Sequence, residues 1–417
     1  MIKVLHFADT HIDIAAHGKR DPESGLPYRV LDFLKALDTI IDTAISEKVN
    51  LVLFAGDAYK DRTPVPTYQR EWGKRIMRLS QAGIPTLLLV GNHDLSPSQG
   101  RANALEEFRT LDVPNIRVID RPVLIKANEF ENLPVQIMAV PWVSRSTSMA
   151  DDQESNEKET KTNAVEQANE SIQDKLIKLI ELWFQRLDPQ TPTIFLAHAS
   201  VQGAVYGNER SIMLGHDYLL PTSLLKNQGI DYVALGHIHK AQNLNKKAHP
   251  PIIYPGSIER VDFGEINDEK YFVIAKIDKG NTKVAWHKLK GRKFIDCEIT
   301  LESEKEFSQQ ILNAVPDPDE AEDAIIRVRI RYPKHIENII DENLIREFLP
   351  NAFSLHIIRR PEIESRIRLN TDSGMESYTT LELLNLYWET KHIKDDREML
   401  NSLAQKVMAA DLPLQKE

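Results

Sequence analysis

The sequence predicts an α/β fold with a largely parallel central sheet, followed by a small α+β domain and a helical C-terminal tail. Through the first half of the chain, near-continuous apolar runs alternate with stretches of helical periodicity. That alternation is typical of a buried parallel sheet with helices on its faces. From Asp57 to Asn92 is 35 residues, the size of one strand–helix–strand unit. Beyond about Phe294 the pattern changes to short strands and short helices, which indicates a separate domain.

The elements of the first half follow from their apolar spacing. Leu31, Leu34 and Leu37 recur at the helical period, and Gly83 followed by Pro85 is a helix stop. A polar stretch without periodicity, 144–174, predicts an exposed loop before the helices and strands resume. The predicted strands are 3–9, 51–57, 86–94, 193–198 and 232–239, and the predicted helices are 30–47, 65–83 and 172–187.

The second half begins with shorter strands of a more antiparallel kind, up to about residue 289. Residues 324–332 then alternate strictly between apolar and basic side chains, which predicts a half-exposed strand. A basic linker, 364–373, precedes a helical stretch at 378–410 that opens on a capping-box pattern, Thr379 to Glu382. The predicted domains are therefore 1–290, 291–372 and 373–417.

Composition sets limits on the class of protein. With 41% hydrophobic and 27% charged residues in 417, the chain has an ordinary globular composition, and no apolar run is long enough to span a bilayer. A single cysteine, Cys297, excludes an intrachain disulfide and a thiolate metal cluster, and fits a reducing, cytoplasmic setting. The net charge of −10 argues against a generic nucleic-acid binder, although a local basic face is compatible with it.

Potential metal ligands follow five of the predicted strands. In parallel α/β sheets, ligands bind beyond the carboxyl ends of the strands, so we expect these side chains to converge on one edge. One such residue alone would be explained as a helix cap or a satisfied polar group. Five strand ends together favour a metal site. The residues are Asp9 and His11, then Asp57, then Asn92, His93 and Asp94, then His198, and finally His237 and His239.

The chemistry of this set indicates two divalent ions. Oxygen and nitrogen donors without sulfur suit first-row metals, with manganese, iron, zinc and cobalt all open. A bridging carboxylate holds such ions about 3.5–4 Å apart, the spacing of two-metal phosphoryl-transfer sites. His-x-His at 237–239 and Asp-x-His at 9–11 each place both side chains on one face of an extended chain.

These segments, DTH, GD, GNHD, a lone strand-end His and GHIH, resemble the signature of the calcineurin-like metallophosphoesterases. The stretch YPGSIERVDFGE at 254–265 and the order of domains resemble the SbcD-type subunits of DNA-repair nucleases. The resemblance implies a metallophosphoesterase sandwich, a small capping domain and two divalent ions, Mn²⁺ first among them. It also implies DNA as substrate and an SbcC-type coiled-coil ATPase as partner, with a homodimer inside a heterotetramer.

Carried over residue by residue, the resemblance implies a role for each ligand. One ion is held by Asp9, His11, Asp57 and His239, and the other by Asp57, Asn92, His198 and His237, so that Asp57 bridges. His93 contacts the scissile phosphate, and Asp94 orients His93. Lys60 stands where related sequences carry His or Asp, and a lysine there can still contact a phosphate.

Two surface elements are predicted to bind partners. Arg327, Arg329 and Arg331, with Arg359 and Arg360, would form a basic face for DNA phosphates, the alternative being a merely solvated charged face. The tail carries two apolar stripes, predicted to dock on the ATPase coiled coil or, alternatively, to pack on their own domain. The stripes are Leu381, Leu384 and Trp388, and Met399, Leu403 and Val407. The resemblance also implies that helices near 67–81 and 102–111 pair across a two-fold axis. Trp72, Ile76 and Met77 are then expected at a dimer interface, the alternative being that they face only their own sheet.

The leading functional hypothesis is a metal-dependent DNA nuclease, acting as duplex exonuclease and single-strand or hairpin endonuclease within an ATP-regulated repair complex. One alternative is a bimetal phosphodiesterase for a small or cyclic nucleotide, which would not need the basic face or the tail. A second is a non-catalytic DNA-binding scaffold, against which the intact ligand set argues.

Overall fold

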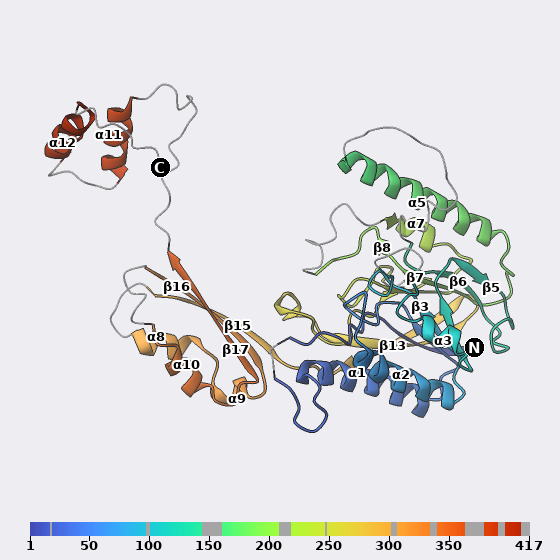
Figure 1. The fold of residues 1–417 in the computed structure, drawn as a ribbon. Coiled ribbons are helices and arrows are strands. Elements are labelled where there is room, and N and C mark those ends of the chain that lie inside the picture. Colours follow the sequence, from blue (N-terminus) through green and yellow to red (C-terminus); the bar gives the residue numbers. More distant parts are fainter. Residues whose placement is uncertain are drawn as a thin grey trace. The chain divides into compact units, whose positions relative to one another are not determined.

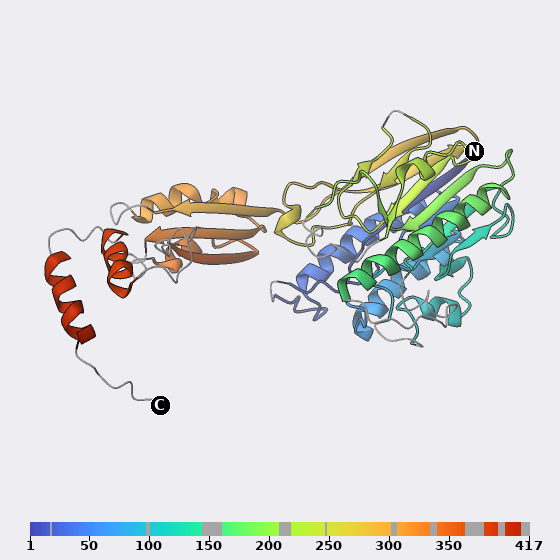
Figure 2. The ribbon, with the colours of Figure 1, turned by 90° about the horizontal axis from the view of Figure 1, so that it is seen from above.

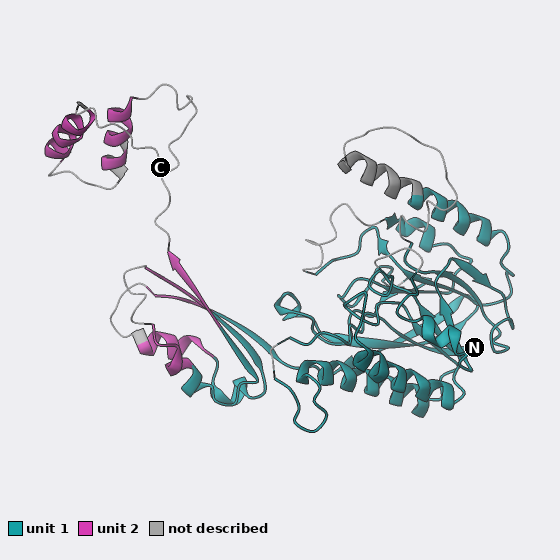
Figure 3. Ribbon diagram, viewed as in Figure 1, with its two compact units in different colours: residues 1–297, 316–328, 346–356 teal, residues 298–315, 329–345, 357–417 magenta. Residues whose placement is uncertain are grey.

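In a computed structural model, the structure describes residues 1–16, 19–96, 101–143, 161–207, 218–246, 248–301, 307–333, 340–362, 379–390 and 397–409. The chain divides into two compact units (Figure 3). The first contains residues 1–297, 316–328 and 346–356, and the second contains 298–315, 329–345 and 357–417. The loop expected at 144–174 lies outside the described residues up to 160, and from Lys161 onward the chain is helical, so the expected loop is wrong there. The linker expected at 364–373 lies outside the described residues. The domain limits near 290 and 372 stay a prediction.

The first unit is built on two six-stranded mixed sheets, where sequence periodicity alone predicts one. The first sheet has the order β14 (Asn281–Leu289), β13 (Lys270–Asp278), β1 (Ile2–Phe7), β2 (Leu51–Phe54), β3 (Thr86–Leu89), β4 (Ile116–Ile119). The second has the order β11 (Gln242–Asn243), β12 (Ile252–Tyr254), β10 (Tyr232–Gly236), β7 (Thr193–His198), β6 (Gln136–Val140), β5 (Val123–Ile125). The strands β1 to β4 are mutually parallel, and so are β6, β7, β10 and β12.

Three apolar clusters make these sheets the middle of a four-layer sandwich. Leu51 and Leu53 of β2 point into the cluster between the sheets, while Val52 and Phe54 point to the outer cluster, which is why the strand is apolar throughout. Helices α1 (Tyr28–Ser46), α2 (Pro66–Gln81) and α3 (Glu106–Thr110) cover the first sheet. Helices α5 (Lys161–Phe184) and α7 (Thr222–Leu225) cover the second, on the opposite side (Figure 1; Figure 2 looks down from the α5 side). A two-stranded ribbon, β8 (Ser200–Val201) and β9 (Leu219–Leu220), completes the unit.

The ends of two helices can be compared with the ends predicted from the sequence. Helix α2 begins with Pro66 in its first turn and ends where Gly83 takes a φ of +67°, with the Ile84 amide donating to the Leu79 carbonyl at 3.0 Å. The stop predicted at Gly83 is thereby confirmed. Helix α5 begins eleven residues before the predicted start at 172, because its first turns contain few apolar residues to mark a buried face.

The remaining elements follow the predicted α+β order. Strands β15 (Phe294–Thr300), β16 (Ile325–Pro333) and β17 (Ser354–Glu362) form a three-stranded sheet, and the boundary between the two units crosses each of them. The helices are α8 (Phe307–Ala314), α9 (Pro318–Ala321), α10 (Glu342–Phe348), α11 (Thr380–Thr390) and α12 (Arg397–Ala409). The predicted capping box forms, with the Thr379 amide donating to the Glu382 carboxylate at 2.7 Å. Among the described residues, every helix is too short or too polar to cross a bilayer.

Candidate metal centre

The carboxyl ends of strands from both sheets meet at the predicted ligands. The backbone amide of His237, after β10, donates to both oxygens of Asp9, after β1, at 3.0 and 3.1 Å. His198, which ends β7, donates from Nδ1 to the carbonyl of Ala55, after β2, at 2.7 Å. The expectation of a single sheet edge is therefore wrong in detail, because the ligands come from two edges that face each other across the sandwich.

The backbone around these ligands is specialised. Asp9, His11, Asp57 and His237 all adopt left-handed conformations, with φ of 50°, 38°, 63° and 98°. Each such non-glycine residue costs on the order of ~1–3 kcal/mol, and strain of this kind gathers at functional sites. The chain also approaches itself closely, because a Cβ on Gly91 would lie 2.2 Å from Asp57 Oδ1.

The first ligand group consists of Asp9, His11 and His239, all buried. The Nε2 atoms of His11 and His239 lie 3.0 Å apart. Their Nδ1 atoms are occupied elsewhere, by the Tyr59 carbonyl at 3.1 Å and by Glu265 Oε1 at 2.8 Å. Two basic nitrogens that face each other at this distance repel unless a cation satisfies both, so His11 and His239 would fit as ligands of one ion.

The second group consists of Asp57, His198 and His237. The Asn92 amide oxygen lies 2.9 Å from His198 Nε2 and 3.0 Å from His237 Nδ1, which adds a fourth donor. Although burial opposes the charged ring, the Asp57 and Asp9 carboxylates raise the pKa of His198 to about 9. Burial likewise opposes ionisation of Asp57, yet the surrounding histidines hold its pKa well below its ordinary value. A buried anionic site that draws a proton onto histidine is one that a divalent cation fits.

His93 lies at the rim and is half-buried. Its Nδ1 donates to the Lys60 carbonyl at 2.7 Å, and its backbone amide donates to Asp57 Oδ1 at 2.8 Å. The expectation that Asp94 orients His93 is wrong. The buried Asp94 carboxylate instead accepts the amides of Asp57, Ala58 and Gly91, each at 2.9 Å, and so ties two ligand loops together.

An open hollow of about 640 Å³ adjoins this rim. It is lined by Asp13, Lys60, Asp61, Arg62, Thr63 and His93. The Asp13 carboxylate accepts the Asp61 amide at 2.7 Å and the Lys60 amide, which holds the loop that carries the exposed Lys60 side chain. The structure thus brings Lys60 and His93 together at one hollow, and their contact with a phosphate stays a prediction.

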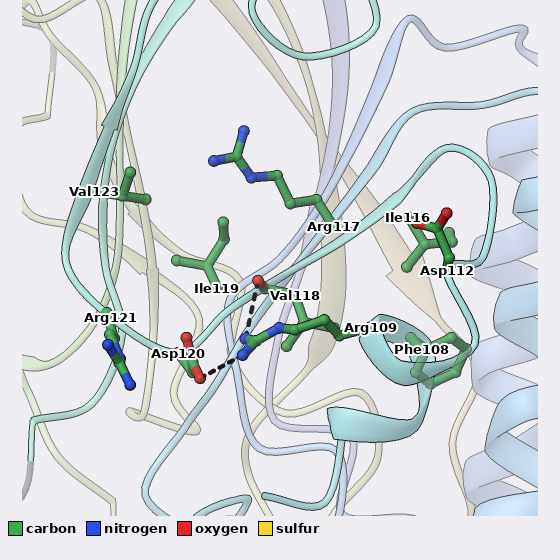
Figure 4. Close-up of a pocket in the computed structure, with 10 residues that line it drawn as sticks. All are labelled: Phe108, Arg109, Asp112, Ile116, Arg117, Val118, Ile119, Asp120, Arg121 and Val123. Atoms are coloured by element: carbon green, nitrogen blue, oxygen red, sulfur yellow. Dashed lines mark hydrogen bonds and ion pairs between the residues drawn. The ribbon is translucent and has the colours of Figure 1, made fainter.

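A second hollow, of about 400 Å³, contains none of the predicted site residues (Figure 4). It lies between α3 and the edge strands β4 and β5, where Arg109 pairs with Asp120 at 2.9 Å. Arg117 points away from this ion pair (Figure 4).

The predicted basic face is largely neutralised. Arg327 forms a two-pronged ion pair with Asp296, its closer contact measuring 2.6 Å. Glu298 pairs with Arg329 at 3.2 Å and with Arg331 at 2.6 Å. Arg359 pairs with Glu342 at 2.8 Å, and Arg360 is exposed. Four of the five arginines expected to meet DNA phosphates are thus paired with carboxylates, and their contact with DNA stays a prediction.

The two apolar stripes of the tail differ in burial. Leu381 and Leu384 are half-buried, and Trp388 donates to Asn401 of α12 at 3.1 Å, so α11 packs against α12. The α12 stripe remains outside, with Met399, Leu403 and Val407 exposed by 67%, 60% and 58%.

The residues expected at a dimer interface lie in the core of their own chain. Trp72 and Ile76 are fully buried against the first sheet, and Met77 packs against the same cluster. Helix α2 therefore provides no support for the homodimer.

The profile of the calcineurin-like phosphoesterase family matches residues 2–241, more than half of the chain. The chain belongs to this family. Together with the two packed sheets, the match confirms the predicted fold class, and the protein is a phosphoesterase with two candidate metal-binding groups. All five strand ends that carry predicted ligands lie within the matched region.

Three proteins of known name are similar to this chain in sequence. The metallophosphoesterase YhaO of Bacillus subtilis is 26% identical over 65% of this chain and 56% of its own length. The DNA double-strand break repair protein Mre11 of Saccharolobus solfataricus is 25% identical over 65% and 58%. The SbcD component of the SbcCD nuclease of Escherichia coli K12 is 23% identical over 67% and 66%. The chain thus spans 56% to 66% of these relatives, and they do not single out the SbcD type.

Sequence reasoning missed the residues that support the ligands. The Tyr59 and Ala55 carbonyls are backbone groups and have no side-chain signal. Glu265 does have one, since it closes the stretch 254–265 on which the family resemblance partly rests, but its contact with His239 spans 26 residues and depends on the fold.

Proposed function

We propose that this protein is a two-metal phosphodiesterase that cleaves DNA, as the nuclease subunit of an ATP-regulated DNA end-processing complex in the cytoplasm. The observation that carries the proposal is the pairing of two buried ligand groups with His93 beside an open hollow that carries Lys60. The similarity to a DNA double-strand break repair protein and to a subunit of the SbcCD nuclease supports DNA as the substrate.

The residues divide into two ion-binding sets. In the proposed assignment Asp9, His11 and His239 would hold one ion, His198, His237 and Asn92 would hold the other, and Asp57 would serve both. Bound divalent ions, Mn²⁺ in the first instance, would supply Lewis acidity to the phosphoryl oxygens and lower the pKa of water.

His93 is suited to proton transfer at the leaving oxygen. Its Nδ1 is fixed as a donor to the Lys60 carbonyl, so Nε2 is the atom that exchanges a proton. Burial, together with the positive charge of Lys60, lowers the pKa of His93. The protonated ring is then a stronger acid toward a departing alkoxide.

DNA would meet the protein first through exposed cations at the rim. Lys60 and Arg62 line the hollow itself, and we propose that they contact backbone phosphates. Arg327, Arg329, Arg331 and Arg359 would have to exchange a carboxylate for a phosphate, so we assign them a smaller share of the affinity than Arg360.

The exposed α12 stripe is proposed to dock on a coiled-coil ATPase of the SbcC type. Met399, Leu403 and Val407 recur every four residues on one helix face, the spacing of a helix that lies in an apolar groove. Because α11 packs on α12, Leu381, Leu384 and Trp388 would support this surface from behind. A homodimer inside a heterotetramer stays part of the proposal, without a located interface.

The test is a manganese-dependent cleavage assay on linear duplex, hairpin and single-stranded DNA, beside a cyclic dinucleotide and an aryl phosphodiester. His93→Ala should lose roughly 10²–10⁴-fold in rate while calorimetry still finds two bound ions. His287→Ala, on edge strand β14, is the matched control and should cleave like the wild type.

If the protein cleaves the cyclic dinucleotide and none of the DNAs, its substrate is a small nucleotide and the proposed DNA substrate is wrong. The ion pairs of the arginines are the observation that favours this alternative. Loss of an ion in His93→Ala would make His93 a ligand and overturn its assigned role.

A further inference from the structure

Behind the first ligand group lies a buried ion pair that the proposed mechanism does not use. Glu265 ends the short helix η1 (Phe263–Glu265), Lys270 begins β13, and each is only 2% exposed. Glu265 Oε1 accepts from His239 Nδ1 at 2.8 Å, and Oε2 accepts from Lys270 Nζ at 2.7 Å. Lys270 also donates to Ser257 Oγ at 2.7 Å.

The stretch 254–265 is shaped around His239. Gly256 adopts a φ of +82°, and a Cβ there would lie 2.4 Å from the His239 carbonyl oxygen. The next amide, of Ser257, donates to that same carbonyl at 3.1 Å. The Asp262 side chain caps η1 by accepting the Gly264 amide at 2.6 Å, which sets Glu265 in place. One segment thus grips both the backbone and the ring of a single ligand.

The pair is unlike the other supports of the centre. The rings of His11 and His198 are held by the backbone carbonyls of Tyr59 and Ala55, which are neutral dipoles. His239 is held by a carboxylate with its own buried counter-charge. A buried ion pair contributes little net stability, because the desolvation of two charges offsets their attraction. Its presence here is better explained by what it does to the ring it touches.

We propose that Glu265, backed by Lys270 and Ser257, is a positioning residue that keeps Nδ1 of His239 protonated and its Nε2 free as a ligand. It thereby sets the ion affinity of the Asp9–His11–His239 group and leaves that of the Asp57–His198–His237 group unchanged. A carboxylate on the distal nitrogen fixes the tautomer of a ligating histidine and raises its basicity. This inference rests on the two-ion assignment proposed above.

The experiment compares three proteins: the wild type, Glu265→Gln and Glu259→Gln. Mn²⁺ is added to each metal-free protein, and its binding is followed by titration calorimetry and by electron paramagnetic resonance. Glu259 is a matched control, because it is a buried glutamate of the same stretch whose carboxylate accepts the Arg260 amide at 2.7 Å and the Arg292 amide at 3.1 Å. In Glu265→Gln one of the two ions should bind roughly 10–100-fold more weakly. In Glu259→Gln both affinities should remain at the wild-type level, whatever the loss in stability.

Two further measurements distinguish a wrong role for Glu265 from a wrong two-ion assignment. Lys270→Met should change the affinity of the same single ion and leave the other unchanged, since it removes the cation that contacts Glu265 at 2.7 Å. Unchanged binding of both ions in Glu265→Gln, or equal weakening of both, would overturn the positioning role. A wild-type protein that binds fewer than two ions would instead reject the proposed function from which the inference starts.

Discussion

Substitution of Gly236 by alanine should push the two sheets slightly apart at the strand ends that carry the candidate metal ligands. Gly236 ends β10 and pairs in register with His198 of β7. A Cβ at this position would lie 2.1 Å from the carbonyl oxygen of Ala55, on the first sheet. That oxygen cannot turn aside without a loss, because it accepts the His198 Nδ1–H at 2.7 Å.

The cost has two parts. An ordinary carbon–oxygen contact requires the strand ends to move apart by about 1 Å, and overpacking of this kind costs about 1–3 kcal/mol. The buried hydrogen bond from His198 is lost as well, at about 1–3 kcal/mol. We therefore expect Gly236→Ala to lower the free energy of unfolding by roughly 2–6 kcal/mol. A displacement of 1 Å in the catalytic groups should also cost about 10²-fold in phosphodiesterase rate.

Urea unfolding of the metal-free protein measures the first effect, and Gly73→Ala is the control. Gly73 lies within α2, where a Cβ would meet nothing within 4 Å, so alanine there should stabilise the protein by about 0.5–1 kcal/mol. The same substitution, glycine to alanine, should thus lower the free energy of unfolding at position 236 and raise it at position 73. A Gly236→Ala protein with wild-type stability and two bound ions would refute the close contact between the sheets.

Three other outcomes can be checked. Burial lowers the pKa of His6 from 6.5 to about 3, so the unfolded chain takes up a proton that the folded one refuses. Stability should be lost by up to about 1.4 kcal/mol per unit as the pH falls from 6.5 toward 3, and His6→Phe should flatten that slope in urea titrations. In calorimetry, Asp57→Ala should weaken both ions, and Asn92→Ala chiefly the second; two normal ions in Asp57→Ala would exclude the bridge. Leu403→Glu should abolish capture by the ATPase coiled coil with no change in melting temperature, whereas a lower melting temperature would place the α12 stripe in the protein's own core.

The strands, the helices and the positions of the candidate ligands were predictable because their signals are local. An apolar run such as Leu51–Phe54 fits a strand buried on both faces, and Asp57, which follows it closely, stands out because nothing in the strand requires a carboxylate there. The glycine at 83 ends its helix by its own conformational freedom. In each case the cause lies within a few residues of the effect.

The division into two sheets was not predictable from periodicity, because it depends on pairings between distant segments. β13 begins more than 260 residues after β1 and yet pairs with it in antiparallel register. The fate of the arginine face was hidden for the same reason. The alternation at Arg327–Arg331 correctly predicted a strand with one polar side, but Asp296 and Glu298, which neutralise it, come from another part of the chain.

The candidate metal centre holds several features that raise the free energy of the folded state, whereas the rest of the unit is a well-packed apolar core. Its carboxylates Asp9 and Asp57 are buried together, four of its residues hold a strained backbone, and the Nε2 atoms of His11 and His239 face each other. A bound cation would neutralise the carboxylates and join the two rings, and the free energy of its binding would offset the cost of the strained backbone. The surrounding core of the two-sheet sandwich is large enough to sustain that cost. The site can therefore be held open at the sheet edges in a geometry that its own residues would not adopt alone.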